Sequence, residues 1–170
     1  ADVAVNRLLK TLQDRRNPDD KGWGAYPGYR ASIPDTPLAM LALQSAGVPL
    51  TDAPSLAATF EASSLTPGPG QRYWLYKMSL LGSTPGETVG EPVLPTALTM
   101  LALKAWGLSS AQVASAGNFL KAKQGTSGIG QGAFTGVDGL FTPLDTAMAG
   151  AALAATGTRA DAAVQAALDQ

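Results

Sequence analysis

A twelve-residue phrase that occurs three times constrains the fold of this chain more than any other feature. It reads TPLAMLALQSAG at 36–47, TALTMLALKAWG at 96–107 and TAMAGAALAATG at 146–157. The copies begin 60 and then 50 residues apart, and each runs from Thr to Gly. A self-similar unit at such a period is typical of stacked repeats, so we expect one supersecondary unit used several times.

Each copy of the phrase predicts an α-helix. Its central run, LAMLAL in the first copy, has no polar face, which indicates a helix that is buried on all sides. Gly47, Gly107 and Gly157 follow the apolar runs, where glycine commonly ends a helix in the left-handed conformation. We call these three elements the Thr–Gly helices.

A second type of helix alternates with the first. Residues 4–14, 110–123 and 160–169 each place apolar residues on one stripe and polar residues opposite, and 53–64 is a weaker case built on Leu56 and Phe60. The stripes of the first two are Val5, Leu8, Leu9 and Leu12, and Val113, Ala116, Gly117 and Leu120, with Gln112 on the polar side of the latter. We call these the flanking helices.

Two layers of helices satisfy this alternation, with apolar Thr–Gly helices inside and amphipathic flanking helices outside. The predicted fold class is therefore all-α, an α/α toroid or partial α/α barrel of about three helix pairs. We expect a single domain over 1–170, either complete or a piece of a larger chain. Its expected parts are repeats at about 1–47, 48–107 and 108–157, and a terminal helix at 158–170.

Composition removes several classes of function. The chain has no cysteine and no histidine, so it contains no thiolate nucleophile, no Ser-His-Asp triad and no ordinary catalytic zinc site. We expect no metal and no cofactor. A net charge of -1 argues against nucleic-acid binding, and no apolar run reaches the roughly 20 residues of a membrane span. A start at Ala1 fits a matured secreted protein or an excised piece, and we favour an extracytoplasmic location, either secreted or on a bacterial cell envelope.

A recurring series of residues links the two helix types. In the first repeat it is Leu9, Gln13, Gly22, Trp23, Asp35 and Thr36; in the third it is Leu120, Gln124, Gly132, Phe134, Asp145 and Thr146. This order resembles the repeat of the terpenoid cyclase and protein prenyltransferase superfamily, and is similar to the QW motif of squalene-hopene cyclases. The middle repeat has Thr96 but neither the Gln nor the Asp.

The resemblance implies a structural role for four of these residues, namely Gln13, Trp23, Gln124 and Phe134. In that family the Gln side chain ties the end of an outer helix to the next loop, and the aromatic ring packs against it. The physical argument agrees, because an amide near a helix C-terminus can pair with backbone groups that the helix leaves free.

The chemistry of the family is missing from this chain. Class II cyclases protonate an alkene with an aspartic acid of a DXDD motif, whereas only Asp35 or Asp145 remains at each matching position. A lone Asp before Thr is more typical of a helix N-terminus than of an acid catalyst. Prenyltransferase zinc needs Cys and His ligands, which are absent. These two aspartates are thus weak catalytic candidates, and we expect no enzyme activity from this segment.

Six aromatic residues lie in or beside the loops. They are Trp23, Tyr26, Tyr29, Tyr73, Trp74 and Tyr76. One interpretation is that they fill the loop side of the helix layers; the other is that they line a groove for an apolar or carbohydrate ligand, since tyrosine and tryptophan combine an apolar face with a polar tip. Residues 72–81 are predicted as a short extra helix, so that 71–82 form a lid, an interfacial helix or part of the core.

Three hypotheses for the function remain open. The first is a non-catalytic binding or interaction module for an apolar, lipid or carbohydrate ligand or a protein partner. The second is a fragment of a class II terpenoid cyclase whose catalytic aspartates lie outside this chain. The third is a scaffold that forms homo-oligomers through the open ends of the repeat array.

Overall fold

A computed structural model describes residues 3–27, 29–77, 88–89, 92–125, 131–134 and 142–156. These residues contain six α-helices and one pair of two-residue strands, which confirms the predicted all-α class. The helices are α1 (Val3–Asp14), α2 (Asp35–Ser45), α3 (Ala53–Ser63), α4 (Val93–Ala105), α5 (Ser110–Lys123) and α6 (Pro143–Ala155). The expected terminal helix at 160–169 lies outside the described residues.

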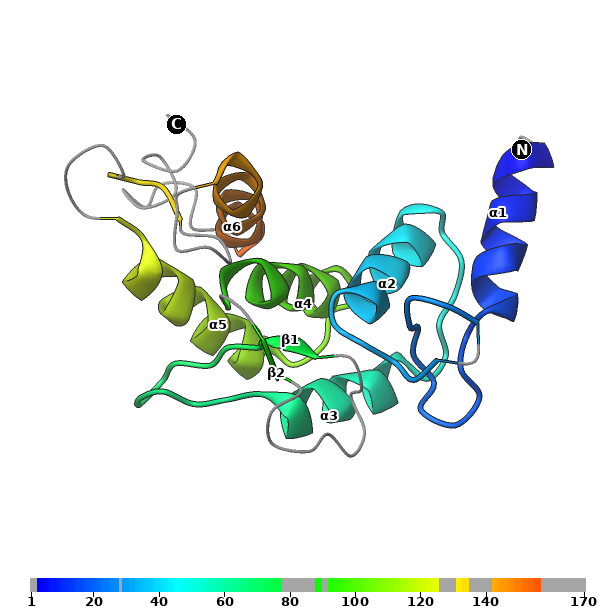
Figure 1. The fold of residues 1–170 in the computed structure, drawn as a ribbon, viewed down its shortest axis with the longest axis horizontal. Helices are drawn as coiled ribbons and strands as arrows, with labels where there is room; N and C mark the ends of the chain where they lie inside the picture. The colour runs from blue at the N-terminus through cyan, green and yellow to red at the C-terminus, as the bar shows by residue number, and fades with distance from the viewer. Residues whose placement is uncertain are drawn as a thin grey trace.

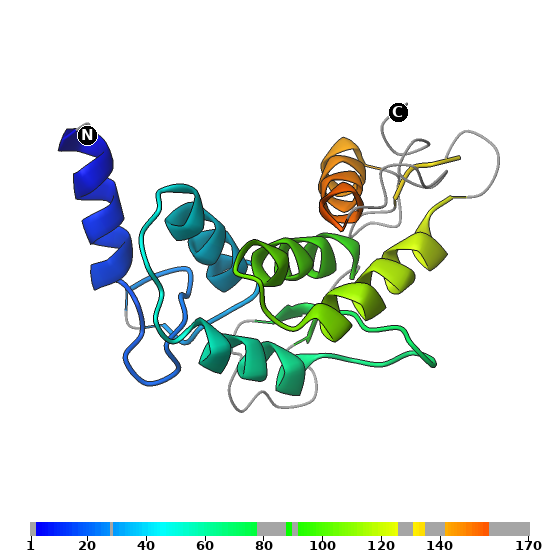
Figure 2. The ribbon, with the colours of Figure 1, turned by 180° about the vertical axis from the view of Figure 1, so that it is seen from behind.

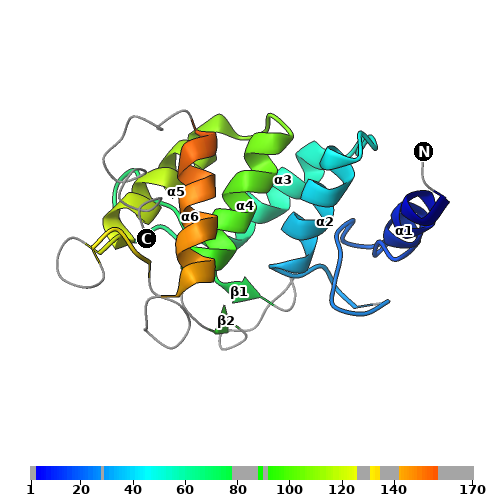
Figure 3. The ribbon, with the colours of Figure 1, turned by 90° about the horizontal axis from the view of Figure 1, so that it is seen from above.

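The three Thr–Gly helices form one layer. Helix α4 lies between α2 and α6 and contacts both, and all three run in the same direction (Figures 1 and 3). Nine residues of α4 are buried, as the uniformly apolar phrase predicts. Buried side chains of all three helices, including Met40, Met100 and Leu153, belong to one hydrophobic core. Burial of such side chains contributes roughly 1.5–3 kcal/mol each, so this layer contributes substantially to stability.

The flanking helices α3 and α5 form a second layer beneath the first, whereas α1 stands at one end of the molecule (Figures 1 and 2). Helix α5 contacts both α4 and α6. A Cβ atom at Gly117 would lie 3.5 Å from Met100 and 3.9 Å from Leu153, which shows that this position of α5 faces both α4 and α6. The alternation of two helix types along the sequence thus becomes an alternation between two layers.

The first two Thr–Gly helices end in the same way. Gly47 and Gly107 have φ values of 68° and 65°, a region that favours glycine because it lacks a Cβ atom. The next N–H groups, of Val48 and Leu108, donate to the carbonyls of Leu43 and Leu103 at 2.9 and 2.8 Å. These bonds pair carbonyls that the helix ends would otherwise leave free. The predicted helix ends are therefore confirmed for these two copies.

The predicted short helix at 72–81 is wrong for its described part. Leu65 and Tyr73 pair as an antiparallel bridge, with N–H···O distances of 2.9 and 3.0 Å in the two directions. Strand β1 (Tyr76–Lys77) then pairs with β2 (Thr88–Val89). Extended pairing competes with helix here because the prolines and glycines of 67–70 favour a turn that returns the chain beside residue 65. Residues 78–81 lie outside the described part.

Two expectations about helix faces also need correction. Val5 and Leu8 on the apolar stripe of α1 are exposed, because no helix of the described residues covers that face. Gln112, placed on the polar side of α5 by the pattern, is buried, and its Oε1 atom has no hydrogen-bond partner in the described structure. The stripe of Val113, Ala116, Gly117 and Leu120 is buried as predicted.

Candidate functional site

The same junction joins a loop to a Thr–Gly helix in each of the three repeats. In the first, the backbone N–H of Trp23 donates to Thr36 Oγ1 at 3.0 Å, and this hydroxyl donates to the Trp23 carbonyl at 2.9 Å. Trp74 and Thr96 repeat both bonds at 3.0 and 3.3 Å. In the third repeat, the N–H of Phe134 donates to Thr146 at 3.0 Å. The Thr that opens each phrase therefore holds the loop to the helix.

The tryptophan rings add a second bond to this junction. Trp23 Nε1 donates to the carbonyl of Leu12 at 2.8 Å, and Trp74 Nε1 donates to that of Phe60 at the same distance. Both carbonyls lie in the last turns of flanking helices, where acceptors lack partners within the helix. Trp74 thus has in the middle repeat the place that Trp23 has in the first, a match that we missed from the sequence. The signal was hidden because Trp74 and Thr96 are 22 residues apart, against 13 for Trp23 and Thr36.

The two glutamines differ in their surroundings. Gln124 Nε2 donates to the carbonyl of Gly132 at 2.8 Å, so its amide ties the end of α5 to the loop that carries Phe134. Gln13 is exposed and lies at the edge of a cavity of about 200 Å³ beside Trp23. In the first repeat, Arg16 rather than Gln13 contacts the loop residue Trp23. Its guanidinium lies 5.0 Å over the Trp23 ring and 2.7 Å from the Asp52 carboxylate.

Both aspartates of the DXDD comparison are bonded to neighbouring hydroxyls. Ser32 Oγ donates to Asp35, and Thr142 Oγ1 donates to Asp145. The Asp145 N–H in turn donates to Thr142 Oγ1 at 3.2 Å, so the Thr142 hydroxyl caps the N-terminus of α6. This geometry supports the role at a helix start that a lone Asp before Thr suggests.

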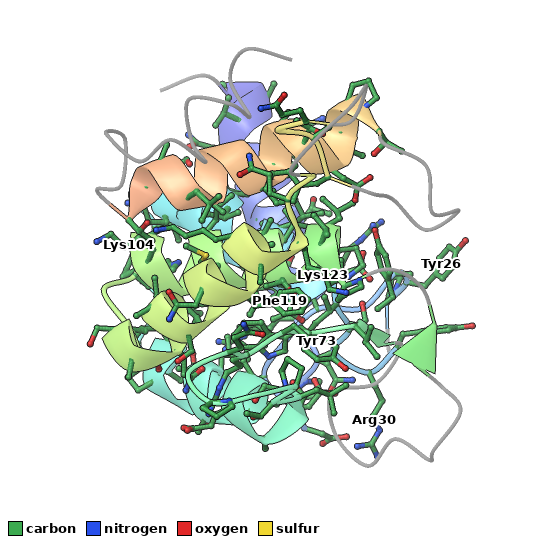
Figure 4. The ribbon with its side chains drawn as sticks, turned by 90° about the vertical axis from the view of Figure 1, so that its left-hand side faces the viewer. Tyr26, Arg30, Tyr73, Lys104, Phe119 and Lys123 are labelled. Atoms are coloured by element: carbon green, nitrogen blue, oxygen red, sulfur yellow. The ribbon has the colours of Figure 1, made fainter. Side chains whose placement is uncertain are left out.

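The six loop aromatics fall into distinct environments. Trp74 is 0% exposed, Trp23 is buried, and Tyr73 stacks on Phe119 with ring centres 4.8 Å apart (Figure 4). Burial, with a smaller effect from the Asp145 carboxylate, raises the pKa of Tyr76. These four side chains fill the loop side of the helix layers, as the first interpretation of the aromatics predicts.

Tyr26 and Tyr29 are the two whose rings lie at the surface. They are 66% and 56% exposed, and their ring centres are 5.5 Å apart at an angle of 60°. Tyr26 points away from the helices, and Arg30 also lies on the outside of this loop (Figure 4). Two adjacent aromatic faces with polar tips form the most accessible aromatic surface of the described residues.

The loop that carries these tyrosines is fixed by buried polar side chains. Asn17 Nδ2 donates to the Tyr29 carbonyl at 3.0 Å, and Asp20 Oδ2 accepts from the Ala31 N–H at 2.7 Å. A Cβ atom at Gly24 would lie 2.4 Å from the Arg30 carbonyl oxygen, so only glycine permits this close approach. Asn17 and Asp20 therefore anchor the loop that carries the two tyrosines.

Neither a metal site nor a membrane-spanning helix is found among the described residues. The described ranges hold no group of three or more acidic residues suited to a metal ion. None of the six helices has the length and apolar character that a membrane crossing requires. Comparison with protein-family models, with curated proteins and with solved structures found no match. The resemblance to cyclase repeats therefore stays a prediction from residue order.

Proposed function

We propose that this chain is a non-catalytic binding module, built from repeats of the α/α-toroid type, that presents Tyr26 and Tyr29 to a carbohydrate. The observation that carries the proposal is the exposure of this tyrosine pair on an anchored loop. The repeated bond between a loop aromatic and the first Thr of each Thr–Gly helix supports the repeat architecture.

Carbohydrate is the ligand class that suits these groups best. The C–H face of a sugar ring packs on a tyrosine face, and its hydroxyls pair with phenol and guanidinium groups. Tyr26 and Tyr29 supply both kinds of contact on one loop, because each has an exposed ring face and a phenol hydroxyl. A lipid surface would call for a broader continuous apolar patch than two rings with polar tips.

The anchored backbone lowers the free-energy cost of binding. Ordering a loop on binding costs free energy, and a loop that is already held loses less. The bonds from Asn17 to Tyr29 and from Ala31 to Asp20 hold the backbone on both sides of Arg30 before any ligand arrives. The hydroxyl partners of Asp35 and Asp145 support a module without acid catalysis.

A panel of neutral and acidic oligosaccharides, screened on an array and then titrated by calorimetry, tests the proposal. Tyr26→Ala and Tyr29→Ala are each expected to weaken binding at least about tenfold while the melting temperature stays near that of the wild type, because both rings are exposed. Gly24→Ala is expected to weaken binding by moving Tyr29 rather than by removing a contact.

Leu65→Ala is the matched control, since Leu65 is an exposed apolar residue of the 65–73 hairpin and should leave affinity unchanged. Binding that survives both tyrosine variants would overturn the proposal, as would a panel without any ligand. Sedimentation with lipid vesicles that depends on Tyr26 and Tyr29, without sugar binding, would assign a membrane surface instead.

A further inference from the structure

The Thr–Gly helices carry two faces that meet their neighbours in the layer. The third and seventh positions of the phrase, four residues apart, share one side of the helix, and the second and sixth share another. The first set, which we call the front face, is Leu38 and Ala42, Leu98 and Ala102, and Met148 and Ala152. The second set, the back face, is Pro37 and Leu41, Ala97 and Leu101, and Ala147 and Ala151.

Burial shows how these faces pair. In α4, which has a neighbour on each side, Leu98 and Ala102 of the front face and Ala97 of the back face are all buried. In α2 the back-face residue Pro37 is buried, and in α6 the front-face residue Ala152 is buried. Helix α4 contacts both α2 and α6, and the other back-face residues, Leu41 and Leu101, are half-buried. This burial fits junctions in which the back face of one helix packs on the front face of the next.

The two outer members of the layer each leave one of these faces uncovered. On α2, the front-face residue Leu38 is 48% exposed, and Ala42 is exposed as well. On α6, the back-face residues Ala147 and Ala151 are exposed, beside a Leu144 that is 60% exposed. Within the part of the chain that the structure describes, the array thus has two different open ends, and each is one half of the junction used inside it.

Helix α1 is uncovered at the same end as α2. Leu12 and Phe60 occupy equivalent places because their carbonyls accept from Trp23 and Trp74. Four residues earlier in each helix stand Leu8, which is 70% exposed, and Leu56, which is fully buried. The flanking helix of the first repeat therefore lacks the same neighbour that the front face of α2 lacks.

A groove marks the place of that neighbour. A cavity of about 300 Å³ lies between α1 and α2, and Leu12, Trp23, Leu38 and Ala42 are among its lining residues. The views from the front and from above both show α1 standing at the end of the array beside α2 (Figures 1 and 3). In the second repeat, the equivalent residues Leu98 and Ala102 are buried, and their helix α4 contacts α2.

We infer that this chain self-associates head to tail, with α6 of a second copy packing in the groove between α1 and α2. Ala147 and Ala151 of one copy would meet Leu38 and Ala42 of the other, as the back and front faces meet within the chain. A second copy is the occupant that fits because each copy carries both halves of a junction that it already forms twice. Such a contact is heterologous, so it produces a closed ring or a growing array rather than a two-fold dimer.

Variants that block one end at a time test this arrangement. Leu38→Glu puts a charge on the front face of α2, and Ala151→Glu puts one on the back face of α6. Each variant alone is expected to be a single chain by native mass spectrometry and sedimentation, whereas the wild type forms larger assemblies. An equimolar mixture of the two should give dimers and nothing larger, because each dimer holds one intact junction and two blocked ends.

Ala122→Glu, on an exposed position of α5, is the matched control and should assemble as the wild type does. Circular dichroism melts establish that each variant is folded, and Leu8→Glu or Ala147→Glu replaces a variant that is not. A wild type that stays a single chain at hundreds of micromolar overturns the inference. So does a mixture without dimers, or a singly blocked variant that dimerises alone. Tyr26→Ala should leave assembly unchanged, which separates this result from the carbohydrate proposal.

Discussion

The hydroxyl of Thr96 accepts a hydrogen bond from the backbone N–H of Trp74 at 3.0 Å, although 22 residues separate them. Both residues are 0% exposed, so this N–H has no access to water. Thr96→Val keeps the shape of the side chain and removes the acceptor. We expect the free energy of unfolding to fall by about 1–3 kcal/mol, the cost of a buried N–H without a partner, as measured by urea denaturation.

Thr96→Ser is the control for that experiment, because it keeps the hydroxyl and removes a methyl group. It should lose less stability than Thr96→Val does. A loss for Thr96→Val that is smaller than the loss for Thr96→Ser would show that the methyl group, and not the bond to Trp74, carries most of the contribution of Thr96.

Trp74 should behave as a core residue. Its ring is fully buried and its Nε1 atom donates to Phe60. Trp74→Ala is expected to lower the free energy of unfolding by about 3–5 kcal/mol, because it opens a large cavity and removes one of the two hydrogen bonds that the Phe60 carbonyl accepts, the other coming from Ser63 Oγ. Thermal and urea unfolding measure the effect, and Tyr26→Ala, at an exposed ring, provides the comparison. An unchanged melting temperature for Trp74→Ala would contradict the core role and restore Trp74 as a candidate ligand contact.

The helix pattern was largely predictable from the sequence. The Thr-to-Gly phrase locates both ends of α2 within two residues and those of α4 within three, and the amphipathic stripe of 110–123 coincides with α5. Both the spacing of apolar residues along a helix and the glycines that end it, such as Gly47 and Gly107, are local features. They can therefore be identified from the sequence alone. This is why the fold class followed from the repeats.

The middle loop was not predictable in the same way. The run from Arg72 to Lys77 contains residues that suit either helix or strand, and the choice rests on its pairing with Leu65 and on the bond from Trp74 to Thr96. Those partners are distant in sequence, so no local pattern contains them. The place of Trp74 in the repeat was missed for the same reason.

The exposure of the aromatic residues was equally beyond the sequence. Tyr26 and Tyr73 are both loop tyrosines, yet the first is at the surface and the second stacks on Phe119. Their exposure differs because of the surrounding structure. Asn17 and Asp20 hold the loop of Tyr26, whereas α5 lies beneath the ring of Tyr73. An aromatic residue in a loop is a candidate ligand contact by its type alone, whereas its accessibility depends on tertiary packing.

Gln124 and Gln13 should differ in their contribution to stability. Gln124→Leu removes the bond to the Gly132 carbonyl, so we expect a loss of about 0.5–1.5 kcal/mol in the free energy of unfolding. Gln13→Leu is the matched change in the first repeat and should cost close to nothing, because its side chain is exposed. Parallel urea titrations compare the two. A larger loss for Gln13→Leu would mean that both glutamines tie helix to loop, as the cyclase resemblance implies.

Tyr76 should make the protein sensitive to alkaline pH. Burial, aided by the Asp145 carboxylate, raises its pKa in the folded chain above the ordinary value of 10.0. The folded state therefore holds this proton more tightly than the unfolded state does, and the associated stability is fully present below pH 10.0 and lost as pH rises through the folded pKa. Tyr76→Phe cannot ionise in either state. Between about pH 9 and 11 it should lose less free energy of unfolding than the wild type, as followed by urea denaturation at each pH. Tyr26→Phe, at an exposed ring, controls for the loss of one phenol, and an identical pH profile for Tyr76→Phe and the wild type would refute the assignment.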